Sequence, residues 1–223
     1  MPAVWLILES SGRSGLVGLA VDGQVALTAR LDEARRHARD LAPTVSRLLG
    51  EVGCQPKHVA GVMVGMGPGS FTGLRIGITS AKAFAYAVGC PLIAVPTFPA
   101  IAVRAPHGMV DVISDGLQRH VYCQRFTDGQ AVGDLAIRTL ADWTATLTPE
   151  IAVTGPAVSQ YDAGIPSSIT RIGESLRLPT IDSLWQVGQS LPPLSQAELF
   201  DLEPLYLRGS SAEELAKTKA KGG

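Results

Sequence analysis

The chain has few cysteines, few aromatic residues and no excess of charge of either sign, and each scarcity excludes a class of protein. Cys54, Cys90 and Cys123 are odd in number, far apart and not arranged as C-x-x-C, which argues against a disulfide framework and a zinc knuckle. The formal net charge is -1 over 223 residues, without the basic footprint of a protein that holds nucleic acid unaided. We expect reduced thiols and, for any RNA contact, a second subunit that binds the RNA.

Long apolar runs are also missing. No stretch approaches the length that crosses a bilayer, and an apolar strand begins after Met1, Pro2 and Ala3 without a basic region or a small-residue cleavage site. We expect no membrane segment and a cytoplasmic location. What is abundant is Gly, Ala and Val within a hydrophobic content of 46%, a balance typical of layered α/β folds whose strands are covered on both faces.

The first half of the sequence predicts three strands, then helix, strand, helix, strand, helix. Asp22-Gly23 is a favoured hairpin dipeptide, and Pro43 is compatible with the first turn of a helix, where amides have no intrahelical acceptor. The expected ranges are strands 3–9, 16–22 and 24–31, helix 40–52, strand 59–65, helix 72–88, strand 92–95 and helix 97–104.

The second half predicts a similar order, so the sequence indicates a duplicated βββαβαβα arrangement in two lobes. The expected ranges are strands 109–115, 120–127 and 130–138, helix 141–147, strands 151–155 and 168–172, and helix 178–191. The boundary is expected near Ala105 to Gly108, giving lobes 1–105 and 106–223. A mobile tail is expected from about residue 212, because KTKAKGG is small and basic.

A glycine-rich turn separates the strand at 59–65 from the long helix. Gly65, Gly67, Gly69 and Gly73 permit positive φ angles and close backbone approach, and Ser70 or Thr72 is placed to cap the helix. The spacing matches neither G-x-x-x-x-G-K-[ST] nor G-x-G-x-x-G at the helix start. Two interpretations stay open: a backbone anion site, or a tight connection between strand and helix.

The long helix carries small residues on one face, every four positions: Gly73, Gly77, Ala81 and Ala85. Each interior glycine costs about 1 kcal/mol of helix stability relative to alanine, which indicates that close packing compensates. The stripe packs either on the protein's own sheet or at a subunit interface. Additional apolar surface for an interface would come from Phe71, Leu74, Ile78 and Val88.

Few groups suitable for catalysis are present. Glu9 and Asp115 end apolar strands; they are either acids facing each other across a nucleotide cleft or ordinary turn residues. The four histidines never lie three or four residues apart, and no G-x-S-x-G occurs, so the sequence predicts no metal site and no nucleophilic hydrolase. Arg75, at the start of the long helix, holds an anion or pairs with a carboxylate across an interface.

Residues 67–102, GPGSFTGLRIGITSAKAFAYAVGCPLIAVPTFPAIA, resemble the signature of the TsaB family. The opening ILESS, HARDLAPTVSRLL, DGLQRHVY at 115–122 and LEPLYLR at 202–208 resemble further family segments, so the likeness covers most of the chain. The resemblance implies a two-lobed actin-like fold (ASKHA, ribonuclease H-like). It also implies a non-catalytic subunit in the synthesis of threonylcarbamoyladenosine, a modified nucleoside beside the tRNA anticodon.

The resemblance implies partners as well. The expected partner is the catalytic paralogue TsaD, bound as a heterodimer and assisted by the ATPase TsaE, with tRNA contacted indirectly and a homodimer possible when the chain is alone. No cofactor is expected in this chain, although ATP or ADP can be present in the complex. The family contact helices map onto residues 38–52 and 72–88, and the candidate interface residues are Leu41, Val45, Leu74, Arg75, Gly77, Ile78, Ala81 and Lys82.

A nucleotide in the cleft would meet residues at the strand ends and the glycine-rich turn. These candidates are Glu9, Ser10, Gly67, Gly69, Ser70 and Asp115. The chain departs from the family here: Glu9 stands where Asp is usual, and Gly116, Leu117 and Gln118 replace a small residue and paired arginines. These departures weaken nucleotide binding as a prediction. The alternative function is an independent actin-like ATPase or phosphotransferase; a peptidase gains no support, because no metal or nucleophile site is visible.

Overall fold

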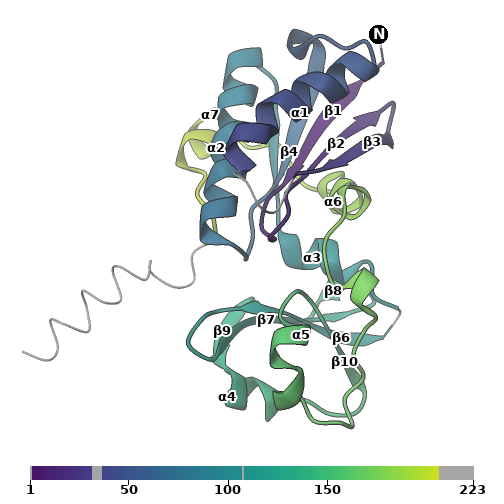
Figure 1. Cartoon of the computed structure of the whole chain (residues 1–223), viewed down its shortest axis with the longest axis vertical. Helices are drawn as coiled ribbons and strands as arrows, with labels where there is room; N and C mark the ends of the chain where they lie inside the picture. The colour runs from purple at the N-terminus through teal and green to yellow at the C-terminus, as the bar shows by residue number, and fades with distance from the viewer. Residues whose placement is uncertain (1, 32–36, 107, 206–223) are drawn as a thin grey trace, which may run out of the picture.

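The computed structural model describes residues 2–31, 37–106 and 108–205 and shows two α/β lobes, one above the other in Figure 1. The first lobe holds a five-stranded sheet in the order β3-β2-β1-β4-β5, in which β1 pairs antiparallel with β2 and parallel with β4. Its strands are β1 (Val4–Glu9), β2 (Leu16–Val21), β3 (Gln24–Arg30), β4 (Val59–Gly65) and β5 (Leu92–Val95). The helices packed on this lobe are α1 (His37–Glu51), α2 (Phe71–Val88), α3 (Thr97–Ala102), α6 (Ile181–Gly188) and α7 (Gln196–Asp201).

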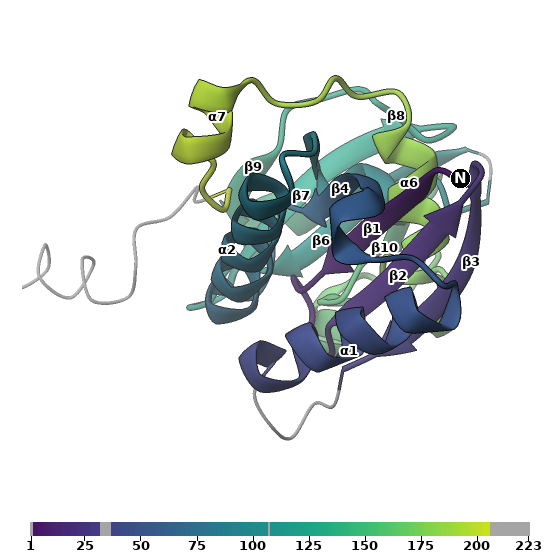
Figure 2. The ribbon, with the colours of Figure 1, turned by 90° about the horizontal axis from the view of Figure 1, so that it is seen from above.

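Helices cover both faces of this sheet, as Figure 2 shows from above. On one face, Leu48 of α1 and Ile78 of α2 pack in a core with buried strand residues. On the other face, Ile181 and Leu184 of α6 pack against Ile7 of β1. The central strands β1 and β4 are therefore buried on both faces, which is why their sequences are continuously apolar. The edge strand β3 instead alternates between half-buried and exposed residues.

The expected elements of the first lobe are confirmed within a few residues. Asp22 and Gly23 both have positive φ angles, 49° and 86°, as a tight hairpin turn requires. One expectation is wrong: α1 begins at His37, so Pro43 lies inside the helix rather than in its first turn. Pro43 therefore removes one intrahelical hydrogen bond. The helix continues beyond this point, and its residues Leu48 and Leu49 are buried.

The second lobe is built on a smaller sheet in the order β10-β6-β7-β8, with β9 also paired to β7. Its strands are β6 (Met109–Asp115), β7 (His120–Thr127), β8 (Gln130–Ala131), β9 (Ala136–Thr139) and β10 (Ile151–Thr154). Its helices are α4 (Leu140–Thr144) and α5 (Val158–Tyr161). The single strand expected at 130–138 is divided into β8 and β9, with Gly133 and Asp134 between them.

The strand expected at 168–172 is also corrected. This segment forms only an isolated bridge between Val153 and Arg171. The Arg171 guanidinium donates to the carbonyls of Pro166, Ile169 and Ile165, so the chain curls around this side chain instead of extending along the sheet. The second lobe therefore follows the first in its order of elements only as far as α5.

The chain returns to the first lobe after completing the second. Helix α3 lies between the lobes, with Ala100 in the core beneath α6 and Phe98 in the core of the second lobe (Figure 1). Beyond it, Trp185 of α6 donates to the carbonyl of Gly23, 3.0 Å away. The division of the lobes at 105/106 stays a prediction, but α6 packs on the first sheet and α7 lies beside α2. The expected tail from about residue 212 lies outside the described residues.

Candidate functional site

The glycines after β4 and on α2 are packed against the carboxyl end of β1. A Cβ atom added at Gly65, Gly69, Gly73 or Gly77 would lie less than 3.0 Å from an atom of the segment 9–11. The atoms met first are Oε2 of Glu9 for Gly65, the carbonyl oxygen of Ser11 for Gly69, that of Ser10 for Gly73, and Oγ of Ser10 for Gly77. The small-residue stripe therefore packs on the protein's own sheet, the first of the two interpretations left open.

Amides of the glycine-rich turn bond to the protein itself. The Gly67 amide donates to Oγ1 of Thr97 at 3.1 Å, and the Ser70 amide donates to the carbonyl of Ser11 at 2.7 Å. Ser70 caps α2 by accepting from the Gly73 amide at 3.2 Å. Three amides that an anion site would use therefore already donate to oxygens of the protein. This geometry favours a tight connection between strand and helix over an anion site.

Glu9 lies beneath this turn with only 3% of its surface exposed. Its Oε1 accepts from the Ser11 amide at 2.5 Å, and its Oε2 accepts from the Thr97 hydroxyl at 3.4 Å. Burial raises the pKa of Glu9, and the hydrogen bonds from Ser11 and Thr97 act against that shift. A carboxyl in this position joins β1, the glycine-rich turn and α3.

Asp115 is engaged in the second lobe. Its Oδ1 accepts from the hydroxyl of Tyr161 at 2.6 Å and from the Leu117 amide at 2.9 Å. Burial acts to raise the pKa of Asp115, but these hydrogen bonds outweigh it and leave the pKa lowered; burial and the bond to Asp115 raise the pKa of Tyr161 to about 12. The carboxylate holds a hairpin tip in which Leu117, Gln118 and Arg119 all have positive φ, a costly conformation for residues other than glycine.

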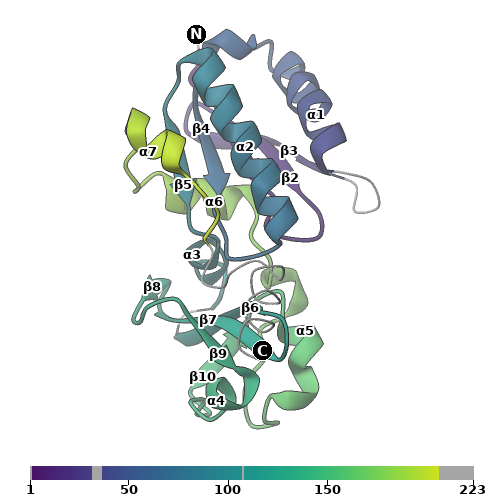
Figure 3. The ribbon, with the colours of Figure 1, turned by 90° about the vertical axis from the view of Figure 1, so that its left-hand side faces the viewer.

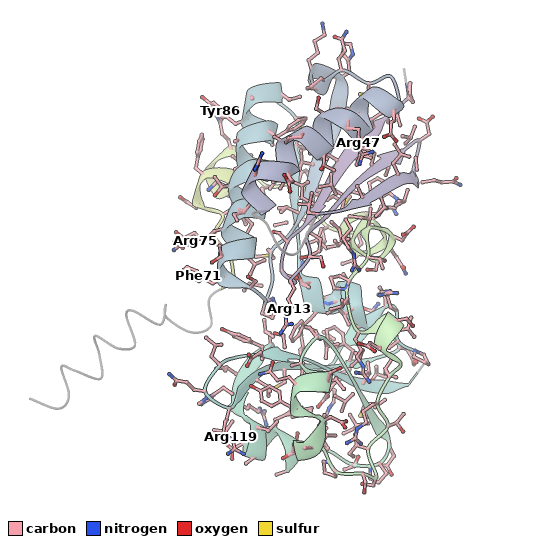
Figure 4. The ribbon with its side chains drawn as sticks, viewed as in Figure 1. Arg13, Arg47, Phe71, Arg75, Tyr86 and Arg119 are labelled. Atoms are coloured by element: carbon pink, nitrogen blue, oxygen red, sulfur yellow. The ribbon has the colours of Figure 1, made fainter. Side chains whose placement is uncertain are left out.

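The expected nucleotide residues therefore divide into two places. Glu9, Ser10, Gly67, Gly69 and Ser70 come together at the end of β1, whereas Asp115 belongs to the β6–β7 hairpin of the second lobe. Arg13, on the turn after β1, extends toward the second lobe in Figure 4. Whether a nucleotide binds between these places stays a prediction.

Two buried hydroxyls near the ends of neighbouring strands were not predicted from the sequence. Ser114 of β6 and Thr154 of β10 are 3% and 0% exposed, and neither side-chain oxygen has a hydrogen-bond partner among the described residues; the same is true of Ser10. β6 and β10 run parallel, with Thr154 paired to Val112. The available signal was a hydroxyl residue at or next to the end of a strand: Thr154 is the last residue of β10, and Ser114 directly precedes the last residue of β6.

The candidate interface residues are mostly interior. Six of the eight are buried in the chain's own core: Leu41, Val45, Leu74, Gly77, Ile78 and Ala81. Their apolar side chains complete the core between the two helices and the sheet, so they are not available to a partner. Arg75 is exposed and Lys82 is half-buried, and these two remain candidates for direct contact.

The outward side of α2 is a different stripe, with residues spaced at about one helical turn. Phe71 is 39% exposed and Tyr86 is 68% exposed, and the guanidinium of Arg75 lies 4.2 Å from the centre of the Phe71 ring. Figure 4 shows these three side chains along one side of the helix. Phe71, Arg75, Thr79, Lys82 and Tyr86 are called the outer stripe below.

Helix α7 lies beside the outer stripe, as Figure 3 shows. The Lys82 ammonium donates to the carbonyls of Phe200 and Leu202, at 2.6 and 3.1 Å, and the Tyr86 and Phe200 rings meet edge to face with centres 5.8 Å apart. A groove of about 720 Å³ runs between α2 and the segment 199–204. It offers aromatic and aliphatic walls together with two basic residues, Arg75 and Lys82, and two acids, Asp201 and Glu203.

Two further properties concern the described residues alone. No helix among them is long and apolar enough to cross a membrane. Within the same ranges, no three His, Cys, Asp or Glu side chains gather in a way that could hold a metal ion.

Comparisons with known proteins agree with the fold and the motifs. A sequence profile described as TsaD, tRNA N6-adenosine threonylcarbamoyltransferase, matches residues 32–175. An uncharacterized protein of Mycobacterium tuberculosis is 37% identical over 123 residues, covering 55% of this chain and 57% of the relative. The Bacillus subtilis protein named tRNA threonylcarbamoyladenosine biosynthesis protein TsaB is 32% identical over 120 residues, covering 51% of this chain and 52% of the relative. The matches thus span little more than half the length of these relatives.

A solved structure extends the likeness to the whole fold. YeaZ from Pseudomonas aeruginosa superposes with a TM-score of 0.73 at 26% identity, covering 92% of this chain and all of that one. The two-lobed actin-like α/β fold is therefore confirmed. The profile match over more than half of the sequence and the shared architecture show that the chain belongs to the TsaD-related family, and within it to the TsaB (YeaZ-like) group.

Proposed function

We propose that this chain is a non-catalytic subunit in the biosynthesis of threonylcarbamoyladenosine in tRNA, and that it binds and activates a TsaD-type transferase. The name of the Bacillus subtilis relative and the description of the matching profile support the pathway. In this proposal TsaD supplies the chemistry and contacts the tRNA, and TsaE acts on the larger complex. The present chain supplies a surface.

The observation that carries the non-catalytic role is the internal use of Glu9 and Asp115, the two acids expected at a nucleotide site. Glu9 is buried and bonded to Ser11 and Thr97, and Asp115 is bonded to Tyr161 and Leu117. A carboxylate that serves a metal-bound phosphate must present its oxygens to the cleft. Glu9 uses both of its carboxylate oxygens and Asp115 uses Oδ1 in local hydrogen bonds, which supports a scaffold.

The surface most suited to a partner is the outer stripe of α2 together with Phe200. It combines exposed aromatic rings with a guanidinium, the residue types enriched at the centres of interfaces. Behind it, the close packing of Gly73 and Gly77 on Ser10 holds the helix rigidly against the sheet, so little order is lost when a partner binds. The partner contact is therefore assigned to side chains that point away from the glycine stripe.

The test is reconstitution with the cognate TsaD. Co-elution at micromolar concentration and TsaD-dependent formation of threonylcarbamoyladenosine on tRNA are expected for the wild-type chain. Arg75→Glu and Tyr86→Ala should each weaken association by tenfold or more, because a central interface side chain contributes about 2 kcal/mol. Arg138→Glu, an exposed charge reversal on β9 of the second lobe, is the matched control and should associate like wild type.

Gly77→Glu is a poor test of this contact. Its side chain would project into Ser10 inside the first lobe, so lost association would report misfolding. Surface variants that keep the wild-type unfolding midpoint separate the two causes. No association of the folded wild-type chain with TsaD would count decisively against the proposal.

A nucleotide-dependent phosphotransferase is the second candidate. The observation in its favour is the pair of unpartnered buried hydroxyls, Ser114 and Thr154, near the carboxyl ends of parallel strands, where α/β sheets bind ligands. Single-turnover hydrolysis of labelled ATP by the isolated chain tests it. Glu9→Ala should abolish any such activity if the cleft performs the reaction.

A further inference from the structure

Helix α7 belongs to a surface segment that is anchored to the first lobe at both ends. Before the helix, the Leu194 amide donates to the carbonyl of Leu92 on β5 at 2.8 Å; after it, the Leu205 amide donates to the carbonyl of Met66 at 3.1 Å. The six residues of α7 include none that is fully buried. A helix of this length is marginal in water, so its position depends on the contacts made between the two anchors.

Apolar, aromatic and polar contacts hold α7 on the first lobe. Leu199 and Leu202 are half-buried against its core. The Phe200 and Tyr86 rings meet edge to face, although these residues stay 56% and 68% exposed. The Lys82 ammonium donates to the carbonyls of Phe200 and Leu202, at 2.6 and 3.1 Å. Since the aromatic pair remains largely in solvent, the two bonds from Lys82 fix where the Phe200 ring lies on α2.

Lys82 binds α7 at the end where a helix has carbonyls without intrahelical partners. The bonded carbonyls belong to Phe200, in the last turn, and to Leu202, the C-cap residue. A lysine can satisfy such carbonyls, and here it comes from a helix more than 100 positions earlier in the chain. The groove around this contact has balanced charges, because it is lined by two bases and two acids: Arg75, Lys82, Asp201 and Glu203.

We propose that Lys82 is a positioning residue that latches α7 onto α2 and thereby completes the surface offered to the partner. The consequence for binding rests on the function proposed above, in which this surface binds TsaD. In the latched state Phe200 lies against Tyr86. In the released state α7 remains tethered through Leu194 and Leu205, but Phe200 leaves the outer stripe. The apparent affinity for TsaD then follows the latched fraction, because only the latched state presents the whole surface.

The first experiment measures backbone hydrogen exchange in the full chain without any partner. In Lys82→Met the Leu199 amide, which is hydrogen-bonded at the start of α7, should exchange about tenfold faster than in wild type or more. The Leu194 amide, bonded to β5 outside the latch, should exchange as in wild type. Lys57→Met makes the same change at an exposed site of the same lobe and should leave both amides unchanged. Equal exchange of Leu199 in Lys82→Met and wild type would overturn the latch.

The second experiment separates positioning by Lys82 from direct contact with the partner. Lys82→Met and Phe200→Ala should each lower the affinity for TsaD by about tenfold. Lys82→Met/Phe200→Ala should bind no more weakly than the weaker single variant, because both changes remove the same ring from the surface. Multiplied losses, about a hundredfold in the double variant, would overturn the positioning role, since they would assign Lys82 to the partner contact itself.

Failure of the latch and failure of the proposed function give different results. Wild-type affinity for TsaD in Lys82→Met, together with faster exchange at Leu199, would overturn the role of α7 in the partner surface and leave the proposed function in place. Wild-type affinity in Phe200→Ala would do the same. No binding of TsaD by the wild-type chain would contradict the proposed function, and the exchange of Leu199 would then decide the latch by itself.

Discussion

Helix propensity and packing predict opposite effects of Gly77→Ala on the free energy of unfolding. Gly77 lies in the interior of α2, so Gly77→Ala should gain about 1 kcal/mol from propensity alone. The added methyl carbon would, however, lie less than 3.0 Å from Oγ of Ser10 and 3.1 Å from its Cβ. Overpacking of a core costs about 1–3 kcal/mol.

We expect the clash to outweigh the gain in propensity, because Ser10 directly follows the central strand β1 and is 2% exposed. Gly77→Ala should therefore be less stable than wild type by about 1–2 kcal/mol. Gly50→Ala is the matched control: Gly50 is also in a helix, α1, but an added Cβ there meets nothing within 4 Å. It should be stabilising by about 0.5–1 kcal/mol.

A second substitution, Ser10→Ala, should restore the stability lost in Gly77→Ala. Ser10→Ala removes the clashing oxygen, which is a buried hydroxyl without a partner among the described residues and therefore costs free energy as it stands. Ser10→Ala/Gly77→Ala should be at least as stable as wild type, with a coupling free energy of about 1–3 kcal/mol. Equilibrium unfolding in urea, followed by the midpoint and by m, measures all four proteins. Equal stabilisation by Gly77→Ala and Gly50→Ala would refute the close approach of α2 to β1.

Three further perturbations concern the buried and hydrogen-bonded acids. Burial raises the folded pKa of Glu9 above its ordinary 4.5, so the stabilising contribution of this group is complete below pH 4.5 and is lost as the pH rises through the folded pKa. In urea unfolding, Glu9→Gln should match wild type near pH 4. At higher pH Glu9→Gln should become the more stable protein, because the neutral amide carries no charge to bury. Tyr161→Phe should raise the pKa of Asp115, seen by NMR titration, and cost about 1–2 kcal/mol of stability. Asp111→Ala leaves the paired guanidinium of Arg125 without its carboxylate and should lower the unfolding free energy by about 3 kcal/mol, measured in urea.

Most helices and strands of the first lobe could be predicted from the sequence. The inner strands β1, β2 and β4 are largely apolar; β1 is followed by Ser10, β2 is followed by Asp22 and β4 ends at Gly65. Helix α2 is bounded by a Ser cap and a Gly with φ of 74°, so these local signals agree with the tertiary structure. The motif of residues 67–102 was sufficient to identify the family. Glu9 lies at the end of the first strand, as the sequence predicted, and is buried there.

The remaining features depend on packing between distant segments. The glycine stripe of α2 has the same spacing whether it meets a partner or the protein's own Ser10, and only the fold decides between them. The return of α6 to the first sheet depends on Trp185 and Ile181 meeting residues more than 150 positions earlier, a pairing that no local pattern encodes. Arg171 lies in an apolar segment that resembles a strand, but its bonds to nearby carbonyls bend the chain.

In this proposal the outer stripe of α2 binds a catalytic partner, while Glu9 in the first lobe and Asp115 in the second hold local structure. The most direct measurement is the TsaD-dependent modification of tRNA by wild type, Arg75→Glu and Glu9→Gln at matched folded concentrations. Full activity is expected with Glu9→Gln, and loss of the complex together with activity is expected with Arg75→Glu. Full activity with Arg75→Glu and none with Glu9→Gln would contradict it.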